Sequence, residues 1–216
     1  MKNYIKQKQS KLKRKRIANI DVFIKDPVKI FDAFPVIEKA LSLVPSQLSN
    51  YVDTIYVGNF KHLNSRNLDA SYGNGVIFLG NDQKSERDMM DDIVHEIAHS
   101  IEDVRNDEIY GDLTIQREFL TKRKKLYTML KEEGFEVDNY SFENVEYSIE
   151  FDEFLYRDVT YSYLRSLTTD IFYSPYAATS IREYFANGFE AVFFDRDSNK
   201  LKKISPILFE KISDLV

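Results

Sequence analysis

Hydrophobic residues recur at helical spacing through residues 82–110, a stretch without proline or glycine. The apolar positions recur at the spacing of a helix, at Met90, Ile93, Val94, Ile97, Ile101 and Val104. This periodicity places them along one face of a helix. Ser85 and Asp88 add the S-x-x-D form that is typical of a helix start. The pattern therefore predicts a long amphipathic helix with one buried stripe.

Short runs rich in β-branched and aromatic residues precede this helix. Val52–Val57 and Gly75–Gly80 are predicted strands bounded by turn residues, and Ile17–Lys25 alternates weakly enough to form a third. Gly75–Gly80 is interpreted either as an edge to which an extended substrate pairs or as an ordinary core strand. Spacing alone does not separate the two. Lys61–Asn67 is polar and predicted to be a loop, in which His62 faces solvent.

Helical periodicity returns in the second half of the chain. Asp112–Glu133 predicts another long helix, and its run Lys122-Arg123-Lys124-Lys125 is expected to be a solvated face. Residues 135–150 are acidic and aromatic and are expected to be irregular. Ala177–Phe194 predicts a helix with a broad apolar face and a polar stripe. That stripe consists of Glu183, Asn187 and Glu190.

Composition and charge narrow the class of protein. With 216 residues and 43% hydrophobic positions, the chain is able to bury a sizeable core. The first 16 residues carry eight Lys or Arg and no acid, although the net charge is −5. Residues 1–18 are thus predicted to be a flexible basic arm, and residues 1–16 either contact nucleic acid or another anionic surface or are simply solvated. The chain has no cysteine, so any metal ligands must be His, Asp or Glu.

Targeting signals are not evident in the sequence. No apolar run approaches the 18 residues of a membrane span, and no apolar core of a secretory signal follows the basic N-terminus. We therefore expect no membrane span and a cytoplasmic location by default. Export by a non-Sec route or carriage in a phage particle would leave no such mark.

The predicted motif helix contains His95-Glu96-Ile97-Ala98-His99, an H-E-x-x-H sequence. Residues four apart lie on the same face of a helix, so both imidazoles would point at one position, where a zinc ion would bind. Glu96 would border that position and take a proton from a zinc-bound water, as metal-assisted peptide hydrolysis requires. The alternative is a helix surface with two satisfied histidines.

A catalytic zinc needs a third protein ligand, and a carboxylate is the economical choice in this chain. Glu183 is a candidate, although Ser180-Ile181-Arg182-Glu183 also has the form of a capping box. Glu190 and Glu153 are further candidates. Spacing alone leaves these alternatives open.

These motifs together resemble the metallopeptidase domain of the anthrax lethal factor-like family, and the clostridial Pro-Pro endopeptidases are similar. The resemblance rests on HEIAH followed by Tyr176, six further residues and Glu183-Tyr-Phe-Ala-Asn-Gly-Phe189. It implies that Glu183 is the third zinc ligand and that Tyr176 assists the transition state. Asn187 stands where the family often has an acid. The long separation of His99 from Glu183 implies a helical insertion around residues 105–170.

The resemblance implies an α+β, mostly helical fold of the zincin type, with a small sheet packed on the H-E-x-x-H helix. Residues 19–216 would form a single metallopeptidase domain. The implied activity is zinc-dependent hydrolysis of a protein or peptide substrate lying extended along Gly75–Gly80. The alternative is a catalytically silent binding or structural module with a zincin fold, part of a phage or toxin polypeptide.

Overall fold

A computed structural model describes residues 12–216, and the chain divides into two compact units. The first unit ends at Val104 and includes Val216, and the second comprises Arg105–Leu215. The division falls inside helix α5 (Glu86–Tyr110), where Arg105 has non-helical backbone angles (φ −112°, ψ 27°). Residues 105–170, the predicted insertion, thus belong to the same unit as the C-terminal helices. The interpretation of residues 19–216 as a single domain stays a prediction.

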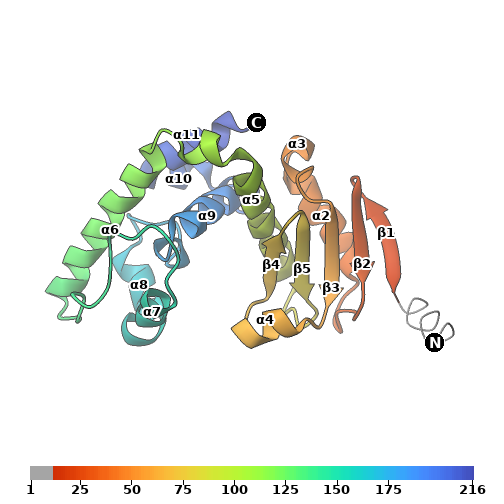
Figure 1. Ribbon diagram of the computed structural model, residues 1–216, viewed down its shortest axis with the longest axis horizontal. Helices are drawn as coiled ribbons and strands as arrows, with labels where there is room; N and C mark the ends of the chain where they lie inside the picture. Colours follow the sequence, from red (N-terminus) through yellow and green to blue (C-terminus); the bar gives the residue numbers. More distant parts are fainter. Residues whose placement is uncertain (1–11) are drawn as a thin grey trace. The chain divides into compact units, whose positions relative to one another are not determined.

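A mixed five-stranded sheet forms the centre of the first unit (Figure 1). The strand order is β1-β2-β3-β5-β4, with β2, β3 and β5 parallel and β1 and β4 antiparallel at the two edges. The strands are β1 (Lys13–Ile17), β2 (Ile20–Ile24), β3 (Thr54–Gly58), β4 (Ala70–Gly73) and β5 (Val76–Gly80). The expectation of an α+β, mostly helical protein with a small sheet is confirmed.

Side chains alternate between the two faces of this sheet, as the pleat requires. One face is fully buried and consists of Ile20, Val22, Ile24, Ile55, Val57, Ile77 and Leu79. Helices α2 (Ala33–Leu43) and α5 lie behind the sheet and contribute their own buried apolar stripes (Figure 1). On the other face Phe23, Tyr56 and Phe78 are half-buried and stack on one another across three strands. The remaining helices of the unit are α3 (Ser46–Ser49) and α4 (Lys61–Arg66).

The predicted basic arm enters the sheet before it ends. Lys13–Ile17 form β1, joined to β2 by a two-residue turn in which Ala18 and Asn19 both have positive φ. Such a turn matches the twist of a hairpin, so the backbone is held although the side chains of Lys13–Arg16 remain exposed. Within the predicted arm, residues 13–17 are therefore a paired strand, and the flexibility of the arm stays a prediction. Residues 1–11, the rest of the arm, lie outside the described residues.

Two other expectations for this unit are corrected. The strand at Gly75–Gly80 is β5 and lies between β3 and β4, so its backbone pairs on both sides and it offers no edge. Lys61–Arg66 forms helix α4 rather than a loop, ended by Asn67 in the left-handed conformation. His62 lies on this helix, where it is exposed and packs edge-on against Phe78.

The second unit is helical. Its elements are α6 (Thr114–Glu132), α7 (Ile149–Glu153), the π-helix η1 (Phe154–Val159), α8 (Tyr161–Leu167), the 3₁₀ turn η2 (Tyr176–Ala178), α9 (Ile181–Phe193), α10 (Ser198–Ile204) and α11 (Pro206–Asp214). Its core is aromatic, with Phe119, Phe172, Tyr184, Phe185 and Phe189 almost fully buried. None of the helices in residues 12–216 is long and apolar enough to cross a membrane.

Glu118 of α6 ties two other helices of this unit together. Its carboxylate accepts hydrogen bonds from the Tyr184 hydroxyl (2.7 Å) and from the backbone N–H groups of Ile207 (3.0 Å) and Leu208 (3.1 Å). The latter two belong to the first turn of α11, whose N–H groups have no partner within the helix. A negative charge is favourable at this end of a helix, so Glu118 fixes α11 against α6 and α9.

The basic run on α6 is not a solvated face. Lys122 and Arg123 are 6% and 1% exposed, whereas Lys124 and Lys125 are exposed as expected. Lys122 donates hydrogen bonds from Nζ to the carbonyls of Ile171 and Ile204. Burial is tolerated because these polar ends find hydrogen-bond acceptors in the interior.

Candidate metal centre

Helix α5 is built as its sequence pattern predicts. Ser85 accepts a hydrogen bond at Oγ from the backbone N–H of Asp88 (3.1 Å), which confirms the predicted helix start. Ile93, Val94, Ile97 and Ile101 are fully buried and hold the helix in the core of the first unit. His95 and His99 lie on a neighbouring face of this anchored helix and are half-buried.

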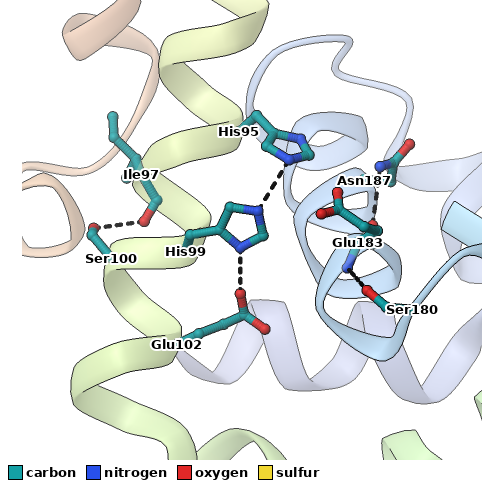
Figure 2. Close-up of polar contacts among 8 residues, drawn as sticks. All are labelled: His95, Ile97, His99, Ser100, Glu102, Ser180, Glu183 and Asn187. Carbon is teal, nitrogen blue, oxygen red and sulfur yellow. Dashed lines mark hydrogen bonds and ion pairs between the residues drawn. The ribbon is translucent and has the colours of Figure 1, made fainter. Parts of the chain in front are cut away.

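The two histidines face one another one helical turn apart (Figure 2). Their Nε2 atoms share a hydrogen bond of 3.1 Å, and their rings are nearly perpendicular, with centroids 4.8 Å apart. Two imidazoles bound to a tetrahedral zinc at about 2.05 Å would have their nitrogens about 3.3 Å apart. The separation on α5 is already close to that value. The helix therefore arranges both Nε2 atoms as a pair of ligands to one ion would require.

A third residue of α5 orients His99. Glu102 accepts a hydrogen bond from His99 Nδ1 at 2.6 Å (Figure 2), and its side chain is almost fully buried. A carboxylate on one ring nitrogen fixes the imidazole tautomer and directs the lone pair of the other nitrogen outward. We did not predict this residue from the sequence, although an acid three positions after the second histidine is a usable signal.

Helix α9 carries the candidate third ligand. Ser180 is the N-cap and accepts a hydrogen bond at Oγ from the backbone N–H of Glu183 (3.2 Å), which confirms this half of the predicted capping box. Glu183 lies in the first turn and is half-buried. Asn187 is 4% exposed and donates from Nδ2 to the Glu183 carbonyl (3.0 Å), while its Oδ1 accepts from the Ser174 hydroxyl. Asn187 thus supports the backbone at Glu183 (Figure 2).

One group of potential metal ligands occurs among the described residues, and it consists of His95, His99 and Glu183. His95 and His99 belong to the first unit of the chain and Glu183 to the second. The alternative carboxylates Glu153 and Glu190 do not belong to this group, nor does His62. Glu153 is exposed and pairs with Arg157 at 3.0 Å.

The two residues predicted to act on the substrate have contrasting environments. Glu96, beside His95 on α5, is 7% exposed. Tyr176 belongs to the 3₁₀ turn η2, is half-buried, and meets the ring of Tyr161 edge-on at 6.2 Å. The sequence predicted that the helix containing Glu183 begins at Ala177, whereas Ala177 belongs to this 3₁₀ turn and α9 begins at Ile181.

Asp92, one turn before His95 on α5, has a perturbed acidity. Burial raises the pKa of this carboxyl to about 7, and the negative charges of Asp69 and Glu96 act in the same direction. Gln83 opposes the increase by donating a hydrogen bond from Nε2 to Asp92 Oδ2 (2.9 Å). A carboxyl that titrates near neutral pH therefore lies on the same helix as the two histidines.

No protein-family model, curated protein or solved structure matched the chain in our comparisons. The functional conclusions consequently rest on the residues themselves.

Proposed function

We propose that this protein is a zinc-dependent metalloendopeptidase of the zincin type, with His95, His99 and Glu183 as the metal ligands. The observation that carries the proposal is the Nε2–Nε2 separation of 3.1 Å within H-E-x-x-H on a buried, well-capped helix. Glu183 joins both histidines among the described residues that could hold a metal ion. The resemblance of the same motifs to the lethal factor-like family points to the same activity.

The donor set suits zinc by its chemistry. Two imidazole nitrogens and one carboxylate oxygen form a common ligand set of catalytic zinc, which keeps a further position for water or substrate. The chain has no cysteine to offer a thiolate. The bond from Glu102 to His99 is the kind of support that ligating histidines usually have. When bound, the ion would act as a Lewis acid toward water and the substrate carbonyl.

Within this proposal each side chain has a defined task. Glu96 takes the proton from the attacking water and delivers it to the departing amine nitrogen. Tyr176 donates its hydroxyl hydrogen bond to the oxygen on which negative charge develops. Ser180 and Asn187 hold the first turn of α9, which presents Glu183.

The substrate class we propose is a protein or peptide in an extended conformation. Because β5 is an interior strand, such a peptide would have to pair with β4, the edge strand of this side of the sheet. Contact of residues 1–16 with nucleic acid stays a prediction, and its described part is the exposed basic strand β1.

Metal content of the wild type and of Glu183→Ala, measured by elemental mass spectrometry, tests the ligand set. We expect about one zinc per chain in the wild type and a strong loss in the variant. Asp158→Ala is a matched control, because this acid is also in the second unit but is exposed and outside the ligand group. No zinc in the wild type after reloading would refute the proposal, and undiminished zinc in Glu183→Ala would refute the third ligand.

Cleavage of a peptide library separates the enzyme from a silent module. Glu96→Gln should retain zinc and lose nearly all activity, because the amide cannot accept the proton. Tyr176→Phe should retain zinc and lose about 10²–10³-fold in kcat, the usual effect of removing one oxyanion donor. Zinc binding by the wild type without cleavage of any peptide would instead favour the silent binding or structural module.

A further inference from the structure

Arg123 is a buried cation that bonds only to backbone. Its side chain extends from α6 and donates from Nη1 to the Ala178 carbonyl (2.7 Å) and from Nη2 to the Ser141 carbonyl (2.9 Å). Longer contacts of 3.4 Å reach the carbonyls of Thr179 and Asn144. No carboxylate of residues 12–216 pairs with it. The planar guanidinium therefore joins two separate loops at once.

Burying this guanidinium costs free energy unless its donors are aligned with the carbonyl groups of both loops. The guanidinium carbon lies 3.9 Å from the centroid of the Phe151 ring, and burial lowers the pKa of the group to about 9. The Nε atom is buried with no hydrogen-bond partner among the described residues. Arginine is the side chain that can serve here, because its donors form a rigid fork whereas those of lysine radiate from one point.

The two loops that Arg123 joins both contact the start of α9. Ala178 and Thr179 come directly before Ser180, the N-cap of that helix. The other loop continues to Val145, whose carbonyl accepts a hydrogen bond from the Ile181 N–H (2.8 Å). Arg123 therefore fixes the first turn of α9 from its preceding segment and from the loop that contacts it.

We propose that Arg123 is a positioning residue for the metal centre, acting through the Ala178–Ser180 backbone to set the direction of Glu183. This inference rests on the proposed function, since it needs Glu183 to be a ligand. It also extends to Tyr176, because the 3₁₀ turn that Ala178 ends begins at that residue. A side chain without any contact to the ion would thus determine how well the third ligand binds it.

The test compares Arg123→Met and Arg123→Lys with Lys122→Met. Lys122 is the matched control because it is the neighbouring buried cation on α6, and its carbonyl partners, Ile171 and Ile204, lie farther from Glu183 along the chain than Ala178 does. Zinc affinity is measured by competition with a chelator, coordination by the visible spectrum of the Co²⁺-loaded protein, and folding by circular dichroism and Tm.

We expect both Arg123 variants to weaken zinc about tenfold or more, as the loss of outer support for a ligand typically does, and to change the Co²⁺ spectrum. Lys122→Met should lower Tm yet keep the wild-type affinity and spectrum. Arg123→Lys retains the positive charge but not the planar fork of donors. Wild-type metal binding by this folded variant would therefore overturn the inference, because it would show that the site requires only a buried positive charge. An equal loss in Lys122→Met would also overturn it, because the effect would then be general destabilisation.

A further variant covers the case in which the Arg123 substitutions prevent folding. Phe151→Leu keeps the guanidinium but removes the ring beneath it. It should weaken zinc about threefold, because only part of the stabilisation that the ring gives the guanidinium is transmitted to the ligand, and unchanged affinity would count against the inference. Wild-type protein that binds neither zinc nor Co²⁺ would refute the proposed function itself, whereas metal-binding wild type with unaffected variants would refute only the role of Arg123.

Discussion

Substitution of Glu102 tests most directly whether its hydrogen bond to His99 orients that histidine for metal binding. Replacing it by alanine removes the acceptor of a 2.6 Å hydrogen bond and leaves His99 Nδ1–H without that partner in a site where the histidine side chain is only 12% exposed. Loss of a partner by a buried donor costs about 1–3 kcal/mol. A cost of 1.4 kcal/mol is a factor of ten in affinity, so Glu102→Ala should weaken zinc about 5- to 150-fold.

Glu102→Gln refines this prediction. The glutamine carbonyl can still accept from Nδ1, so the ring orientation should survive while the charge is lost. A hydrogen bond to a charged group contributes about twice as much as one between neutral groups. We therefore expect a loss of about 3- to 10-fold, between the wild type and Glu102→Ala.

The assay is competition for zinc with a chromophoric chelator at a fixed pH, on protein shown to be folded by circular dichroism. Glu86→Gln is the control, because it removes an exposed acid from the first turn of the same helix. Zinc binding by Glu102→Ala within twofold of the wild type would refute the reasoning. So would an equal loss in Glu86→Gln, which would indicate a general effect of charge on the helix.

Three further predictions concern stability. The pKa of Asp92 is raised from 3.8 to about 7, so the folded state binds this proton more tightly than the unfolded state does. The free energy of unfolding therefore falls by up to about 4 kcal/mol as the pH rises from 4 to 7. Asp92→Asn in the presence of a chelator should accordingly raise Tm at pH 8 and leave it unchanged at pH 4, and equal shifts at both pH values would contradict this. Gly188→Ala should cost about 1–3 kcal/mol in urea unfolding, since the new Cβ would lie 2.5 Å from Leu208 Cδ2, whereas Gly73→Ala, with open space, should be neutral. Glu118→Gln should cost about 2 kcal/mol by turning an N–H acceptor at α11 into a donor, and a change below 0.5 kcal/mol would refute that role.

Local sequence patterns predicted much of the secondary structure and part of the candidate site. The apolar period and the Ser85 cap predicted α5, and the four-residue spacing of His95 and His99 predicted that their rings face one another. These features depend on contacts within one or two helical turns. The candidate third ligand is different, because it is distant in sequence from the histidines, and spacing alone left Glu183, Glu190 and Glu153 as alternatives.

Residue type misled the interpretation of α6. Lys122 and Arg123 were assigned to solvent because four basic residues follow one another, yet they stand three and four positions after the buried Phe119 and before the buried Leu126. Their positions in the helical repeat would have placed Lys122 and Arg123 on the apolar stripe. What the sequence could not supply is the set of distant backbone carbonyls that makes their burial possible.

The position of β5 shows where strand patterns stop being informative. A run of apolar residues describes an edge strand and an interior strand equally well, because both bury one face. The sequence nevertheless held a signal for a partner, since Asn74-Gly75 is the dipeptide preferred in two-residue hairpins and both residues have positive φ. That turn pairs β5 with the four-residue strand β4, which our strand prediction omitted. Because β4 then occupies the edge, a substrate that extends the sheet must meet Ala70–Gly73, and substitutions there, not in β5, should change peptide affinity.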